Sequence, residues 1–123
     1  MVSIFGYFFY ICMQQKSYFS VYFLKEADRF LKSLDLQTQK KILFNLEYAQ
    51  YRIDAELFKK IRGDIWEFRT NFSKSQIRLL AFWDKRKKDD THVIVTHGFI
   101  KKTWEVPEKE IKKAESARIR FLQ

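Results

Sequence analysis

Side chains that can bind or react with a phosphate are concentrated in the second half of the chain. Arg69 and Arg78 lie in two strand-like segments, and a third strand-like run contains His97 and ends at Lys101 and Lys102. A guanidinium can engage two phosphate oxygens at once, whereas a lysine acts as a point charge. Histidine has an ordinary pKa close to neutrality, which suits proton transfer. These residue types predict chemistry without a metal, a nucleotide cofactor or a nucleophilic cysteine.

The overall charge agrees with a polyanionic or acidic partner. The chain has 123 residues, of which 46% are hydrophobic and 18% aromatic, so we expect a single globular domain. Lys and Arg outnumber Asp and Glu by 24 to 15, which gives a net charge of +9. The excess is either a binding face or a surface that is basic only for solubility. Its concentration in residues 56–104 favours a binding face.

The cysteine and histidine pattern argues against a metal site. Cys12 is the single cysteine, which excludes an internal disulfide and a Cys-rich zinc site. His92 and His97 lie five positions apart in a strand-like run, so they are predicted to point to opposite faces. The three glycines are isolated, so the chain carries neither a Walker loop nor a dinucleotide fingerprint. We therefore expect neither a metal nor a cofactor.

Residues 1–17 are predicted to be a leader in front of a domain that spans residues 18–123. Ile4–Met13 is apolar but shorter than a membrane span, and it lacks the basic flank and the cleavage site of a signal peptide. Three interpretations remain: an extra strand or partner-binding segment, a disordered leader, or upstream sequence before a true start at Met13.

The remaining pattern predicts an α+β domain with the element order βααβββα. Strands are expected at Tyr18–Leu24, Ile65–Phe72, Ile77–Asp84 and His92–Ile100. Apolar residues at helical spacing predict one helix through Leu34 and a second that is capped by Asp35 or Thr38 and ends at Tyr51. Pro107 opens a C-terminal helix with an acidic first turn. We expect an antiparallel-rich sheet of about four strands with an N-terminal helical hairpin and a C-terminal helix.

The alternation in Ile65–Phe72 separates a core face from a polar face. The even-numbered residues are aromatic or Thr and are predicted to face the core, while Glu67 and Arg69 share the other face. Arg69 can then bind a phosphate or form a structural ion pair with Glu67 or Asp84. Arg78 is either a second phosphate ligand or a lone polar residue at a sheet edge.

Several segments in a fixed order carry a family resemblance. FLKSLD and KILFNLEYAQ form the predicted helical hairpin, IWEFR, IRLLAFWD and VTHGFIKKT form the strands, and a proline precedes EIKKAE in the last helix. The ordered set covers about Tyr18–Phe121 and resembles the RelE/ParE superfamily of bacterial toxins, specifically its HigB-like, phage-derived branch. The resemblance implies a small RelE-like domain.

The resemblance also implies an activity and partners. Such a toxin is cytoplasmic, cleaves messenger RNA, usually in the ribosomal A site, and is held inactive by an antitoxin encoded beside it. The implied partners are the ribosome, mRNA and a helix-turn-helix, HigA-like antitoxin, which would make any DNA contacts; no membrane is involved. Two alternatives remain open: a ParE-like toxin that binds DNA gyrase without cutting RNA, and an inactive phage-derived binding protein.

Catalytic roles follow from the resemblance and from the chemistry of RNA cleavage. Metal-free cleavage needs an aligned ribose 2′-hydroxyl, a base, an acid and positive charge around the phosphate. Arg69, Arg78 and Lys102 are expected to supply catalytic charge, and His97 and Glu67 are the acid and base candidates. His97 can instead be a hydrogen-bonded strand residue. The lysine pair can be a solvated strand end, or one cation can lower the pKa of the other.

A further group of residues is expected to bind RNA: Lys59, Lys60, Arg62, Lys101 and Trp104. The basic run before Gly63 either approaches the RNA backbone or is an ordinary solvated charge run. Trp104 either stacks on a splayed base or packs the last helix against the sheet.

Overall fold

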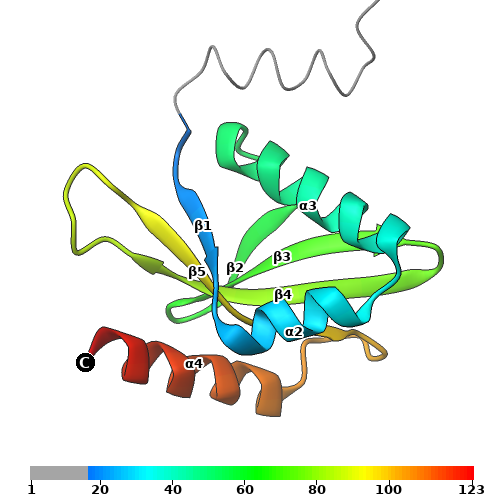
Figure 1. Cartoon of the computed structure of the whole chain (residues 1–123). Coiled ribbons are helices and arrows are strands. Elements are labelled where there is room, and N and C mark those ends of the chain that lie inside the picture. The colour runs from blue at the N-terminus through cyan, green and yellow to red at the C-terminus, as the bar shows by residue number, and fades with distance from the viewer. Residues whose placement is uncertain (1–16) are drawn as a thin grey trace, which may run out of the picture.

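The computed structural model describes residues 17–123, and the leader predicted for the N-terminus lies outside them except for its last residue. The elements run in the order β1 (Ser20–Phe23), α2 (Lys25–Ser33), α3 (Leu36–Tyr51), β2 (Phe58–Arg62), β3 (Ile65–Phe72), β4 (Ser75–Asp84), β5 (His92–Ile100) and α4 (Glu108–Leu122). Helices α2 and α3 cover one face of the sheet and α4 covers the other (Figure 1). None of the helices among these residues is both long and apolar enough to cross a membrane.

The described strands form one five-stranded mixed sheet in the order β1-β5-β4-β3-β2. β1 runs parallel to β5, and the other neighbours are antiparallel. The predicted α+β class is confirmed. β2 was not predicted, because its sequence FKKIR lies in the segment interpreted as a linker. It pairs with β3 on one side only, so its charged side chains reach solvent at the sheet edge.

The helices form as their sequences predict. The Asp35 carboxylate accepts a hydrogen bond from the backbone N–H of Thr38 at 2.8 Å, which confirms Asp35 as the N-cap of α3. Ile42, Leu46 and Ala49 form the buried side of this helix. Pro107 lies just before α4, where Ile111 is buried. These buried sides fix how each helix lies on the sheet.

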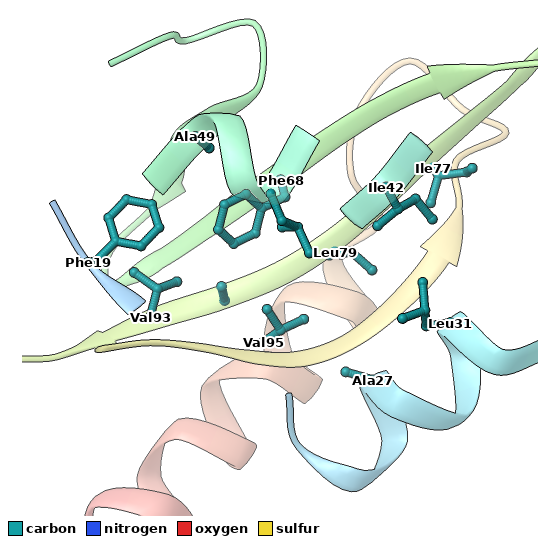
Figure 2. Close-up of a cluster of buried hydrophobic side chains, with 12 residues drawn as sticks. Phe19, Ala27, Leu31, Ile42, Ala49, Phe68, Ile77, Leu79, Val93 and Val95 are labelled. Carbon is teal, nitrogen blue, oxygen red and sulfur yellow. The ribbon is translucent and has the colours of Figure 1, made fainter. Parts of the chain in front are cut away.

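Two apolar cores occupy the two faces of the sheet. The first lies between the sheet and helices α2 and α3, and includes Phe68, Leu79 and Val95 (Figure 2). The second lies under α4 and includes Leu80 and Phe82. Alternate residues of β4 therefore enter opposite cores, and this strand is buried on both faces.

A β-bulge in β5 changes the direction of one predicted side chain. Leu80 pairs with His97, and the next residue of β4, Ala81, pairs with Val95, so Thr96 is the extra residue. His92 pairs with Asp84. Both histidines therefore lie on the α4 face of the sheet, and the prediction that they point to opposite faces is wrong. Within residues 17–123, no three His, Cys, Asp or Glu side chains are grouped as a metal ion would require.

Candidate functional site

A groove of about 390 Å³ lies on the α4 face of the sheet, between β2 and the loop that leads into α4. We call it the β2–α4 groove. Basic side chains from β2 and from the end of β5 meet a buried carboxylate of β3 here. It is lined by Lys59, Lys60, Ile61, Arg62, Glu67, Lys101, Trp104, Glu105, Val106, Glu108 and Ile111.

Strand register brings four cations together around Glu67, of which Lys59 and Lys101 line the groove and Arg69 and Arg78 lie beside it. Lys59 pairs with Glu67, and Arg69 pairs with Arg78. The backbone N–H of Lys101 donates to the Gln76 carbonyl at 2.7 Å, which places Lys101 beside the start of β4. The sheet thus gathers cations from four strands and strand ends around Glu67.

Glu67 lies between two guanidinium groups without a close contact to either. Its Oε1 is 3.6 Å from Arg69 Nε and its Oε2 is 3.8 Å from Arg78 Nε. Within the described part of the chain, Glu67 Oε2 and both Nε atoms are buried and have no hydrogen-bond partner. Buried polar atoms in this state are uncommon and mark candidate functional sites.

Arg78 is fixed beneath the groove. It is fully buried in β4, and its guanidinium donates to Asn71 Oδ1 at 3.0 Å, to the Ile77 carbonyl at 2.9 Å and to Gln76 Oε1 at 3.3 Å. Burial lowers its pKa, and the carboxylate of Glu67 opposes this shift. The interpretation of Arg78 as an edge residue is wrong, because β4 lies between β3 and β5.

Arg69 is the more accessible arginine, with 23% of its side chain exposed. It faces Glu67, as one interpretation of the sequence proposed, and its Nη1 is also 3.9 Å from Glu56 Oε2. Asp84, the other suggested partner, bonds to Arg86 at 2.9 Å instead. Arg69 can therefore reach a ligand from its place beside the buried Glu67.

The two lysines after β5 differ in environment. Lys101 is half-buried, whereas Lys102 is exposed and does not line the groove. Burial lowers the pKa of Lys101, and the positive charges of Arg78, Arg69 and Lys59 lower it further, against the opposing effect of Glu67. The cations that act on Lys101 thus come from neighbouring strands rather than from Lys102.

His97 is separated from this cluster. It is 2% exposed and lies under α4, with Nε2 3.3 Å from Glu110 Oε1 and Nδ1 2.9 Å from Thr96 Oγ1. Burial and the charge of Lys113 lower its pKa, while Glu110 and Glu26 raise it. His97 does not line the groove.

The residues predicted to bind RNA are divided by the fold. Trp104 is 95% exposed at the groove, so it does not pack the last helix against the sheet. Arg62 forms a 2.6 Å ion pair with Glu108 at the start of α4. Lys59 pairs with Glu67 on the α4 face, whereas Lys60 pairs with Trp66, whose row of the sheet faces the first core.

Sequence reasoning missed the two amides that hold Arg78. Asn71 lies inside the predicted strand Ile65–Phe72 and Gln76 lies just before the next one, and the two residues are a cross-strand pair within the hairpin. Their amide oxygens accept from the Arg78 guanidinium. The turn between the two strands contains Ser73 and Lys74, both at positive φ.

A known protein family matches most of this chain. Residues 29–118 match the model of the family described as phage-derived protein Gp49-like (DUF891). The matched segment includes every residue of the β2–α4 groove. No curated protein matches the chain.

The Gp49-like family is a RelE/HigB-like toxin family, and membership implies a cognate antitoxin as partner. The match covers most of the chain and begins within α2 and ends within α4. The chain therefore belongs to the phage-derived Gp49-like family of RelE/HigB-like toxins.

Proposed function

We propose that this protein is the toxin of a type II toxin–antitoxin system and belongs to the HigB-like branch. It acts in the cytoplasm as a ribosome-dependent endoribonuclease on messenger RNA. The observation that carries this proposal is the cluster of Arg69, Arg78 and Lys101 around the buried Glu67, with hydrogen-bonding atoms that the described residues leave unpaired.

The cations of the groove suit a phosphate that gains charge during the reaction. Arg69 and Lys101 are the groups within reach of a ligand, and they bind the scissile phosphate. Arg78 contributes a fixed positive charge from beneath, because its side chain is held by three hydrogen bonds. Positive charge held in place before the reaction stabilises the phosphorane without reorganisation.

Proton transfer is assigned to Lys101 in preference to Lys102 and His97. The ribose 2′-oxygen attacks the adjacent phosphorus and gives up its proton to the neutral Lys101 amine. The bond from phosphorus to the 5′-oxygen then breaks, and that oxygen takes up a proton from water. The products are a 2′,3′-cyclic phosphate and a 5′-hydroxyl. A lowered pKa favours the neutral amine that the first step needs.

The other carboxylate and imidazole candidates have different roles in this proposal. Glu67 is a positioning residue whose carboxylate lies between the two guanidinium groups and sets their separation. His97 would reach RNA only if α4 moved away, so it serves the fold. Lys59 and the exposed Trp104 bind the RNA on either side of the cleaved bond, Trp104 by stacking on a base.

The antitoxin is expected to be a helix-turn-helix, HigA-like protein that covers the groove. Its acidic side chains would replace RNA phosphates at Lys59, Arg69 and Lys101. Because the antitoxin supplies the DNA-binding element, the toxin itself needs no DNA contact.

Induction of the full chain in a bacterial host tests this function. Translation should stop, and new mRNA 5′ ends should appear within codons. The double variant Arg69→Gln/Lys101→Gln should lose both effects. Lys88→Gln, which removes an exposed cation in the β4–β5 loop, should keep them. DNA damage with intact mRNA would overturn the nuclease and indicate a gyrase-binding toxin.

A further inference from the structure

A second hollow lies on the opposite face of the sheet from the β2–α4 groove. It has a volume of about 440 Å³ and is lined by residues of the β2–β3 turn and of the start of the β4–β5 loop. These two connections lie toward the same end of the sheet (Figure 1). Two tryptophans and two lysines line it together with the turn between β2 and β3. The lining residues are Lys60, Gly63, Asp64, Trp66, Trp83 and Lys85. We call it the Trp66–Trp83 hollow.

The aromatic walls of this hollow are held by packing. The rings of Trp66 and Trp83 meet edge to face, with centroids 5.5 Å apart. Trp66 lies against Phe58 at 4.9 Å, and Trp83 lies against Phe19 at 5.1 Å. Rings fixed in this way lose little conformational entropy when a flat ligand stacks on them.

One residue in the wall of the hollow, Trp83, carries an unsatisfied hydrogen-bond donor. The indole nitrogen of Trp83 is buried and has no hydrogen-bond partner among residues 17–123. A buried indole N–H normally finds an acceptor. A ligand that carries a carbonyl, ring nitrogen or hydroxyl oxygen beside the ring would satisfy it.

The charges around the hollow favour an anion next to an aromatic group. Lys60 and Lys85 are exposed, and Lys85 Nζ lies 5.0 Å from the centre of the Trp83 ring. The one acidic side chain, Asp64, has its Oδ2 3.5 Å from Arg118 Nη2, which offsets its charge. Stacking rings beside lysines are the usual elements of single-stranded nucleic acid binding.

We propose that the Trp66–Trp83 hollow binds a nucleotide of single-stranded RNA outside the cleavage site. The base stacks on the tryptophans, the Trp83 N–H donates to it, and Lys60 and Lys85 bind the flanking phosphates. The choice of RNA as ligand rests on the proposed function.

The edge strand β2 provides the route between the two sites. Lys59 and Lys60 are consecutive residues of this strand: Lys59 lines the groove, and Lys60 lines both the groove and the hollow. Because β2 has no strand beyond it in the described sheet, RNA can pass around its edge and meet both lysines. The hollow thus adds contacts to RNA nucleotides that lie beyond the cleaved phosphate.

Tryptophan fluorescence reports on this site directly. In a full-length Trp104→Phe variant, Trp66 and Trp83 are the remaining tryptophans. Titration with a short oligouridylate should quench their emission to saturation. Adding Lys60→Gln/Lys85→Gln should weaken binding roughly tenfold near 0.15 M salt and reduce the slope of log K against log salt by about 1.4, the loss expected for two phosphate contacts of a single strand.

A matched control removes the same number of charges from the β4–β5 loop, which also contains Lys85. Lys87→Gln/Lys88→Gln takes two exposed lysines from the β4–β5 loop that do not line the hollow, and it should leave the binding midpoint within about twofold because no phosphate contact is lost. Equal effects of the two double variants, or no quenching by RNA, would overturn the proposal. Quenching by polyglutamate but not by RNA would overturn it in favour of an acidic protein partner.

The two proposals fail separately in these experiments. Arg69→Gln/Lys101→Gln should abolish cleavage while the quenching of Trp66 and Trp83 remains. If the wild-type protein cleaves no mRNA but RNA still quenches these tryptophans through Lys60 and Lys85, RNA binding at the hollow is supported and the nuclease activity is contradicted. If cleavage occurs and the two lysine double variants bind RNA equally well, the nuclease activity is supported and RNA binding at the hollow is contradicted.

Discussion

Glu67 is a buried carboxylate that lies between two guanidinium groups. Because these groups are buried together, the stability of the fold should depend on the negative charge of Glu67. Taking one partner from a buried ionic cluster leaves the others uncompensated. Arg69 and Arg78 would then repel each other across a single strand pairing.

Replacing Glu67 should therefore destabilise the fold. We expect Glu67→Gln to lower the free energy of unfolding by about 2 to 4 kcal/mol. Glu56→Gln is the matched control, because Glu56 faces the same Arg69 at 3.9 Å but its side chain is 87% exposed; it should cost less than about 0.5 kcal/mol. Urea unfolding measures both. Similar losses in the two variants would show that burial of Glu67 is not the cause.

Lys101 combines a charge and a releasable proton, and a conservative substitution separates the two. Arginine keeps the charge but cannot act as a base at ordinary pH. We expect Lys101→Arg to lower kcat for RNA cleavage on ribosomes about 100-fold, with a much smaller change in KM. The wild-type rate should rise with pH at lower values than an ordinary lysine would give, because the pKa of Lys101 is lowered.

The neighbouring residue provides the comparison. Lys102→Arg alters an exposed side chain outside the groove, so kcat and its pH profile should stay as in the wild type. A kcat loss confined to Lys102→Arg would instead assign proton transfer to Lys102.

At the scale of elements, His97 links β5 to α4 and makes the contact between them sensitive to pH. The groups that face it are Glu110 and Lys113 of α4 and Glu26 of α2. The pKa of His97 is lowered from its ordinary value of 6.5, so the unfolded chain binds the proton more readily. This contribution to stability is complete above pH 6.5 and is lost as the pH falls towards the lowered folded pKa.

The pH dependence of unfolding tests this link. Between pH 7 and 5.5 the free energy of unfolding should fall by up to about 1.4 kcal/mol per pH unit. His97→Gln should reduce this slope while the other histidine remains. An unchanged slope in the variant would remove His97 as its source.

Contact between α2 and β5 depends on the absence of a side chain at Gly98. A Cβ atom built there would lie 2.3 Å from Phe30 Cδ2 and 2.7 Å from Leu79 Cδ2. We expect Gly98→Ala to cost about 1 to 3 kcal/mol of stability through overpacking. Phe30→Leu in the same chain should recover part of that loss in thermal unfolding. Equal stability of Gly98→Ala and the wild type would mean that α2 shifts freely on the sheet.

The sequence predicted those elements whose patterns are local. The Asp35 cap, the buried side of α3 and the alternation of β3 each depend on neighbouring residues, and each is present. The α4 helix begins beside Pro107 for the same reason. Charged residues Glu67 and Arg69 were correctly placed on one face of β3 because strand periodicity fixes alternate directions.

Features that depend on pairing between strands were not predictable in the same way. β2 reads as a charged linker because an edge strand needs little apolar surface. The bulge at Thr96 has no residue signature, since threonine is an ordinary strand residue. Burial of Arg78 follows from partners supplied by Asn71 and Gln76 once the hairpin closes.

At the scale of the whole molecule, a chain of net charge +9 presents lysines at sites on both faces of the sheet. Contacts from Lys59, Arg69 and Lys101 to phosphates should give a slope of log K against log salt of about −2 for single-stranded RNA, and the hollow should make it steeper. Binding measured at several salt concentrations tests this. A slope near zero would contradict phosphate binding by these cations.

The parallel pairing of β1 with β5 joins Ser20 to His92 and so connects the first described strand to the last. During synthesis, β1 leaves the ribosome long before its partner exists. β1 therefore remains without its partner strand until β5 emerges from the ribosome. Contacts between residues so distant along the chain also form slowly. The nascent toxin consequently cannot acquire its finished sheet until β5 has been synthesised and has left the ribosome.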